Sequence, residues 1–256
     1  MAEIVKEKEA PIGFVSLNRP EFMNTFNVAL ATQLNQSLLE FDDDPQVKVV
    51  VIKAQGYNFS AGIDLNEFLR REGEDLRDFV KLMELHNHTI ARMKKPVIAS
   101  VRGYVLANGA GLMMASDFAI ASENAKIGTT AIRVGLACIG PGVVAARCVG
   151  RKKALEMVLL GEWIDAHEAY RLGLVNRVVP DDSLEEETKS FALMLAEKNP
   201  LAIELAKRGI YASEDLPYHE ALDYASELFT FLAQTEDAKE GIRAFLEKRK
   251  PNWKGR

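Results

Sequence analysis

Two strand-to-helix turns built from small residues carry the clearest chemical signal in the sequence. One is YVLANGAGLMMASD at Tyr104–Asp117, where small residues crowd Ala107–Gly111 after the strand-like run Lys95–Gly103. The other is NFSAGIDL at Asn58–Leu65, which follows the apolar run Val49–Ala54. Such turns let a ligand approach bare backbone, and the N–H groups at a helix start are free to receive negative charge. Two converging N–H donors would stabilise a thioester enolate or a tetrahedral oxyanion, although two ordinary turns would show the same spacing.

Alternating strands and helices in the first part of the chain would position these turns. Apolar, β-branched runs predict strands at 13–18, 47–54, 97–101 and 118–121. Helical periodicity predicts intervening helices at 28–42 and 76–93. This alternation predicts parallel strand pairing with right-handed crossovers. After about residue 185 the strands stop, and we expect helices at 184–198, 200–213, 218–234 and 238–248.

Composition and charge exclude several classes of protein. The 256 residues are 48% hydrophobic and 27% charged, with a net charge of −5, which argues against a general nucleic-acid binder. No apolar run approaches the roughly 20 residues that span a bilayer, and the first residues lack the apolar centre of a signal peptide. We therefore expect a cytoplasmic enzyme with no membrane partner. Cys138 and Cys148 lack metal-ligand spacing, so we expect no metal site.

The order of these blocks resembles the crotonase superfamily, the fold of enoyl-CoA hydratases and isomerases. Further matching blocks are VSLNRPEFMNTFN at 15–27, VGRKKALEMVLLGEWIDAHEAYRLGLVNRVVP at 149–180 and EGIRAFLEKRKPNW at 240–253. The resemblance covers nearly the whole chain. It implies an α/β, ClpP-like crotonase spiral of ββα units at residues 1–185 and a helical trimerisation region at 186–256, together one family unit. It also implies self-association as a trimer or a dimer of trimers.

The ligand that this resemblance implies is an acyl-CoA thioester. Coenzyme A is then part of the substrate, and no separate cofactor is expected. The backbone N–H groups of Ala61 and Asn108 would hold the thioester carbonyl, although the family usually has glycine at the second position. Asp64 is expected to cap the following helix. Coenzyme A contacts are implied for Met23, Ala61, Ile63, Asp64, Phe245 and Lys248, the last two from a neighbouring subunit unless they form only a solvated helix end.

The two glutamates that activate water in typical hydratases are absent. Read onto the family blocks, the first position falls on Gly111 and the second on Ala131, and neither side chain can carry a proton. Isomerases that keep only the second glutamate would also lack it here. The chain is similar to a branch of enoyl-CoA hydratase domain-containing proteins that lack both glutamates.

Four side chains are candidates to replace those glutamates. His88 lies where aryl-CoA dehalogenases of the superfamily carry a histidine, but their nucleophilic aspartate would fall near Ile139, which argues against that reaction. Thr130 matches a threonine of the superfamily's decarboxylases. Glu67 and Glu84 lie on helices whose orientation the sequence leaves open.

Three classes of function stay open at this level. The first is lyase or isomerase chemistry on acyl-CoA thioesters with rearranged acid and base groups. The second is decarboxylation or other enolate chemistry that needs only the backbone donors, and the third is acyl-CoA binding without catalysis. Because each general acid or base supplies roughly 10²–10⁴-fold, we expect weak hydration of crotonyl-CoA.

Overall fold

A six-stranded sheet lies at the centre of the computed structural model, which describes residues 2–256. Its strands, in the order β1-β2-β3-β4-β6-β9, are Ile4–Glu9, Ile12–Leu17, Val49–Ala54, Val97–Val101, Phe118–Ser122 and Arg177–Val179. β1 pairs antiparallel with β2, and the remaining neighbours pair in parallel. The parallel pairing predicted from strand–helix alternation is confirmed.

A smaller sheet extends the core and was not predicted from the sequence. It has the order β5-β7-β8, with strands at Tyr104–Leu106, Lys126–Gly128 and Trp163–Asp165. Three residues are too few to show the period-2 alternation by which a strand is recognised. β5 leads directly into the second small-residue turn, so this sheet fixes where that turn lies.

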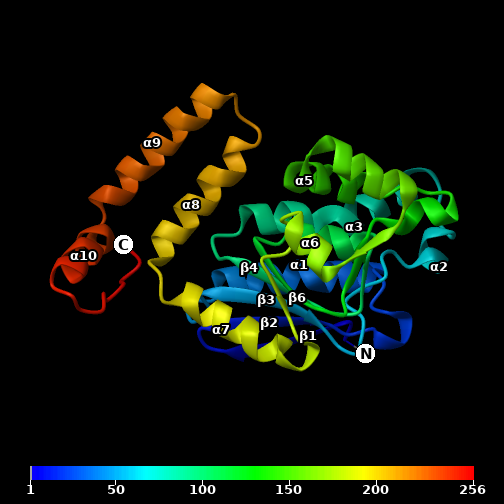
Figure 1. Cartoon of the computed structure of the whole chain (residues 1–256), viewed down its shortest axis with the longest axis horizontal. Coiled ribbons are helices and arrows are strands. Elements are labelled where there is room, and N and C mark those ends of the chain that lie inside the picture. The colour runs from blue at the N-terminus through cyan, green and yellow to red at the C-terminus, as the bar shows by residue number, and fades with distance from the viewer. Residues whose placement is uncertain (1) are drawn as a thin grey trace.

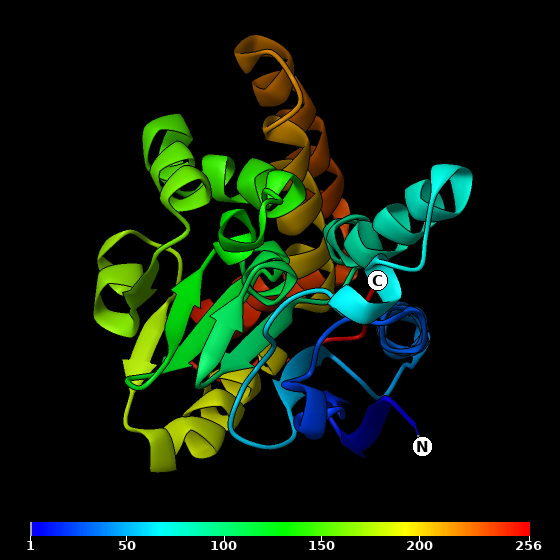
Figure 2. The ribbon, with the colours of Figure 1, turned by 90° about the vertical axis from the view of Figure 1, so that its right-hand side faces the viewer.

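Helices cover both faces of the large sheet (Figures 1 and 2). α1 (Val28–Asp43), α3 (Gly73–Arg92) and α4 (Asn108–Ala115) lie on one face, and their buried side chains share one apolar cluster with strand residues. α7 (Leu184–Ala196) covers the other face, where it forms a second apolar cluster with β2, β3, β4 and β6. α7, at the start of the helical region expected at 186–256, therefore packs on the sheet as part of the core.

α5 (Ile139–Leu160) packs against α4, on the face of the large sheet that α4 covers. Its helical geometry is interrupted at Gly150, where φ is 76° and ψ is 161°. The two shorter helices of this part are α2 (Leu65–Phe68) and α6 (Ala166–Arg171). α5 matters for the site because its first turn faces both α3 and α4.

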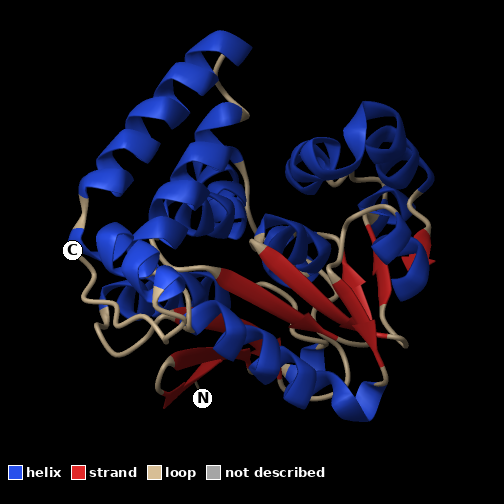
Figure 3. Ribbon diagram, turned by 60° about the vertical axis from the view of Figure 1, so that its left-hand side comes forward, coloured by secondary structure: helices blue, strands red, loops and turns tan. Residues whose placement is uncertain are grey.

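α8 (Pro200–Ser213), α9 (Tyr218–Gln234) and α10 (Glu236–Leu246) project from the core (Figures 1 and 3). The observed bounds of α8 and α9 coincide with the predicted ones. A buried ion pair ties α8 to the sheet: Lys207 Nζ lies 2.7 Å from Asp117 Oδ2, and the Tyr211 hydroxyl donates to Asp117 Oδ1 at 3.0 Å.

Large apolar side chains on these helices face solvent in the single chain, including Ile210, Phe229, Phe231, Ile242 and Phe245. Exposed apolar surface of this kind is typical of an interface between subunits. No described helix is both long enough and apolar enough to cross a membrane.

Candidate active site

A parallel bridge brings the two small-residue turns together. Ser60 pairs with Val105 of β5. Ser60 N donates to Tyr104 O at 3.0 Å, and Leu106 N donates to Ser60 O at 2.8 Å. The segment before the first turn thus continues the edge of the small sheet. The two segments, at Ser60 and at Leu106, leave that edge side by side.

Missing side chains let the two backbones approach each other closely. A Cβ atom on Gly62 would lie 2.7 Å from Cβ of Ala107 and 3.7 Å from the backbone nitrogen of Asn108. A Cβ atom on Gly109 would lie only 2.6 Å from the carbonyl oxygen of Ser60. Any side chain at either glycine would push the turns apart, so glycine is required at both positions for this close approach.

The N–H group of Ala61 is already engaged within the chain. It donates to Met23 O at 3.0 Å, and the neighbouring Gly62 N–H donates to Ser60 Oγ at 3.2 Å. Ala61 was expected to hold a thioester carbonyl through this N–H, which in this structure already has the acceptor Met23 O. Met23, expected to contact coenzyme A, lies beside this turn and supplies the acceptor for Ala61.

The backbone N–H of Ile63, unlike that of Ala61, has no acceptor within residues 2–256. Phe26 N donates to Gly62 O at 2.7 Å, and Asp64 N donates to Phe26 O at 2.9 Å. These two bonds form the parallel bridge between Phe26 and Ile63, in which the N–H of Ile63 itself takes no part. Within residues 2–256, no acceptor receives that N–H. The family resemblance implied that Ile63 contacts coenzyme A. No pattern in the sequence indicated that its backbone N–H lacks an acceptor.

The second turn leaves its donors open at the start of α4. Ala107 precedes the helix with φ 49° and ψ −117°, and no side chain caps the helix. The N–H of Asn108 therefore lacks an acceptor inside the helix, as expected for the first helical residue. The Asn108 side chain donates from Nδ2 to Met83 O of α3 at 3.1 Å.

Asp64 acts as a helix cap, as the sequence suggested. Its Oδ1 accepts from the backbone of Asn66 at 3.0 Å and of Glu67 at 3.3 Å, and its Oδ2 accepts from Arg19 at 3.1 Å. Glu67 is similarly engaged, because its Oε2 accepts from Val28 N at the start of α1 at 3.1 Å. Both carboxylates hold the first turn in place through these internal hydrogen bonds.

Gly111 and Ala131 occupy different surroundings. A Cβ atom on Gly111 would lie 3.1 Å from Cγ of Pro141, a buried residue in the first turn of α5. Ala131 and Thr130 are half-buried in the short helical turn Thr130–Val134. Pro141 therefore takes part of the space into which a larger side chain at position 111 would project.

The two histidines of α3 face opposite ways. His86 is fully buried against Phe26, with ring centroids 5.6 Å apart, and burial lowers its pKa to about 4. His88, the expected catalytic candidate, is exposed. His88 lies one helical turn from Glu84 on α3, so it is near the site, but its side chain faces solvent.

Glu84 is the acidic side chain of α3 that approaches α5. It is half-buried, and its carboxylate lies against Gly140, where a Cβ atom would overlap it. Burial raises the pKa of its carboxyl group, and the nearby His88 opposes that shift. No described residue forms a hydrogen bond or ion pair with this carboxylate.

Phe245 and Lys248 lie far from the turns within one chain. Figure 1 shows α10 at one end of the molecule and α2 at the other. Phe245 is 82% exposed. Contact between these residues and a ligand at the turns therefore requires a second copy of the chain.

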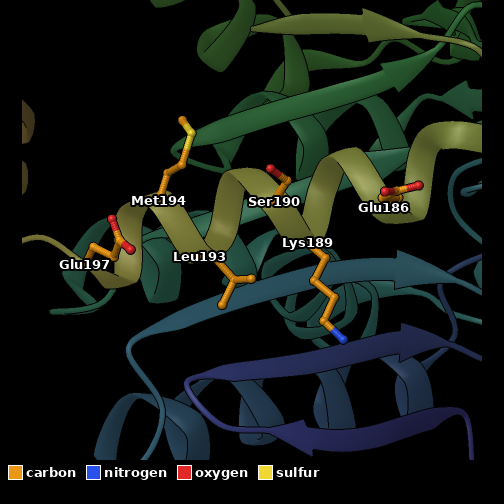
Figure 4. A pocket seen from close by; sticks show the side chains of 6 residues that line it. All are labelled: Glu186, Lys189, Ser190, Leu193, Met194 and Glu197. Carbon is orange, nitrogen blue, oxygen red and sulfur yellow. The ribbon is translucent and has the colours of Figure 1, made fainter.

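A surface hollow on α7 is separate from this site. It is lined by Glu186, Lys189, Ser190, Leu193, Met194 and Glu197 (Figure 4). Because α7 covers the opposite face of the sheet from α4, these side chains do not reach the turns.

Known proteins similar to this chain share its length and fold. The family model described as enoyl-CoA hydratase/isomerase matches residues 7–256. Enoyl-CoA hydratase domain-containing protein 3, mitochondrial, from Xenopus laevis is 35% identical, with 97% of this chain and 85% of the relative covered. The 2,3-dehydroadipyl-CoA hydratase of Escherichia coli is 37% identical, with 100% of both chains covered. A solved enoyl-CoA hydratase from Geobacillus kaustophilus superposes with a TM-score of 0.94 at 31% identity, covering 100% of this chain and 98% of that one.

Proposed function

The chain belongs to the enoyl-CoA hydratase/isomerase family of the crotonase superfamily, and from this membership we propose that it binds an acyl-CoA thioester and stabilises its enolate. The thioester oxygen accepts hydrogen bonds from the backbone N–H groups of Ile63 and Asn108. The observation that carries the proposal is the meeting of two turns, each with one N–H group that the chain leaves unused.

The chemistry follows from where negative charge develops. Removal of a proton from the carbon next to the thioester carbonyl moves charge onto the carbonyl oxygen. Two N–H donors already fixed by the fold stabilise that charge without reorganising, and such donors contribute large rate effects. The positive end of the α4 dipole adds to the same stabilisation.

We assign weak hydratase activity to this site. The family resemblance places the water-activating glutamates at Gly111 and Ala131, and Pro141 packs beside the first of these positions. Enolate stabilisation does not depend on those carboxylates, so lyase or isomerase chemistry through an enolate is compatible with their absence. An acyl-CoA that binds without any proton transfer would instead make the chain a binding protein.

The assembly is part of the proposal. Phe245 and Lys248 would contact coenzyme A from a neighbouring subunit of a trimer or a dimer of trimers. The exposed apolar side chains of α8–α10 and the distance of α10 from the turns support this arrangement. Light scattering should give a mass of at least three chains of 28.4 kDa, and a monomer at micromolar concentration would overturn it.

Calorimetry tests the binding proposal. Butyryl-CoA should bind more tightly than free coenzyme A, because only the thioester offers a carbonyl oxygen to the two donors. A panel of short, long and dicarboxylic acyl-CoAs, none of which binds, would refute the proposed function.

A further inference from the structure

We propose that Glu84 is the catalytic base that removes and returns the α-proton of the acyl chain, in place of the absent glutamates. The inference rests on the proposed function, since it needs an acyl-CoA held by Ile63 and Asn108. Its starting point is the position of the Glu84 carboxylate, which lies on the first turn of α5 where Gly140 has no side chain.

That place is next to the position of the family's first glutamate. Gly140 is followed by Pro141, whose Cγ lies 3.1 Å from a Cβ built on Gly111. The Glu84 carboxylate, reaching from α3, and Gly111 of α4 thus lie against consecutive residues in the first turn of α5. The preceding residue, Met83, accepts the hydrogen bond from the Asn108 side chain, which fixes this turn of α3 against the start of α4.

Glu84 also differs from the other carboxylates around the turns in having no internal partner. Asp64 caps α2 and pairs with Arg19, while Glu67 holds the start of α1. No such bond is made by Glu84 to any residue in the described range. Partial burial of an unpaired carboxylate costs stability, and groups of this kind concentrate at functional sites.

The proton transfer balances with this one group. The Glu84 carboxylate accepts the α-proton, the C–H electron pair forms the enolate double bond, and the carbonyl π pair moves onto the oxygen held by Ile63 and Asn108. The resulting carboxylic acid returns the proton to the α-carbon. With a 3-enoyl chain it returns the proton to the γ-carbon instead, which produces the 2-enoyl isomer without water or an oxidant.

The test follows the exchange of the α-protons of butyryl-CoA for deuterium in D₂O by mass spectrometry. Glu84→Gln should lower the exchange rate about 10²–10⁴-fold, the usual contribution of a general base, while calorimetric affinity for butyryl-CoA changes less than about threefold. Glu84→Asp should retain part of the rate. Gly140→Ala should also lower the rate with Glu84 intact, because the new Cβ displaces the carboxylate. Glu74→Gln, an exposed change on the same helix, is the matched control.

Each outcome decides between the two proposals. Exchange by Glu84→Gln at the wild-type rate overturns Glu84 as the base and leaves the proposed binding function intact. Binding of butyryl-CoA by the wild type without exchange also overturns the base. Failure of the wild type to bind any acyl-CoA overturns the proposed function itself. Thermal melting of each variant shows whether a lost rate reflects lost folding.

Discussion

The turn at Ser60–Asp64 and the turn at Leu106–Asn108 differ in how their backbone groups are satisfied. In the first turn, Ala61 donates to Met23, and Asp64 caps the helix that follows. Glycine takes its left-handed position, with φ 108° at Gly62. In the second turn a non-glycine residue, Ala107, takes a positive φ of 49°, and no side chain caps α4.

The two turns therefore contribute to the site in different ways. The first turn is a rigid support that leaves one N–H free, at Ile63. The second turn is strained at Ala107, and no side chain caps the N–H groups at the start of α4. Strained backbone and unmade hydrogen bonds persist in folded proteins mainly where function needs them. The following predictions test that division, from the largest expected effect to the smallest.

Introducing glutamates at positions 111 and 131 should have the largest effect, on the rate of hydration at the second turn. The triple variant Gly111→Glu, Ala131→Glu, Pro141→Ala should hydrate crotonyl-CoA at least about 10²–10⁴-fold faster than the wild type. Pro141 is included because its Cγ would lie 3.1 Å from the new Cβ at position 111. Loss of crotonyl-CoA absorbance measures the rate. A wild-type turnover above about 10 per second would show that another water-activating group is present.

Removing one donor from the open turn should slow enolate formation. Asn108→Pro deletes the N–H at a helix position that tolerates proline, and it should lower α-proton exchange in butyryl-CoA about 10²–10³-fold. Asn108→Gly is the control, because it removes the bond to Met83 O but keeps the backbone donor. Equal rates for the two folded variants would contradict the role of this N–H.

Protonation of His86 at low pH should destabilise the fold, because His86 packs behind the first turn. The ring packs on Phe26, which is hydrogen-bonded to both Gly62 and Asp64. The folded-state pKa of His86, about 4, lies below the ordinary histidine value of 6.5, so the unfolded chain binds the proton more readily. Stability is therefore full above pH 6.5 and falls by about 3 kcal/mol as the pH drops through 4.

Chemical denaturation between pH 7 and pH 4 measures this loss. His86→Leu should reduce the pH dependence, whatever its own cost at pH 7. His167→Gln, at an exposed histidine, should leave the dependence unchanged. A His86→Leu curve parallel to the wild type would exclude His86 as the cause.

Exchanging the residue types of the two turns should have opposite effects on stability. Gly62→Ala should cost about 2 kcal/mol or more, because its φ of 108° and the 2.7 Å approach to Ala107 both exclude a Cβ. Ala107→Gly should stabilise the fold by about 1 kcal/mol, because glycine adopts a positive φ without strain. Urea denaturation of both variants gives the sign, and equal signs would contradict the contrast between the turns.

Much of the fold could be predicted because its long elements have clear periodicity. The parallel strands, α8 and α9 appear where the apolar pattern placed them. β5, β7 and β8 are too short to show a pattern. α5 was not predicted at all, and its first turn contains Gly-Pro-Gly at 140–142, which is typical of a loop. Proline is nevertheless tolerated in the first turn of a helix, where its missing N–H is not needed.

The two small-residue turns could be located from sequence, but not which of their backbone N–H groups lack an acceptor. Small residues marked both turns, yet the choice between Ala61 and Ile63 depends on a hydrogen bond to Met23 in a distant segment. Asn108, which the resemblance implied as a backbone donor, is the first residue of α4, and His88, a candidate to replace the glutamates, is exposed. The direction of Glu84 depends on the packing of α3 against α5, which no local pattern encodes.

The most direct test of the central claim is the infrared carbonyl frequency of bound butyryl-CoA labelled with ¹³C at the thioester carbon. Hydrogen bonds from Ile63 and Asn108 should polarise the carbonyl and lower its stretching frequency on binding. The shift should persist in Asn108→Gly and shrink in Asn108→Pro. A bound thioester whose carbonyl frequency equals that of free butyryl-CoA would contradict the claim that these two backbone donors hold it.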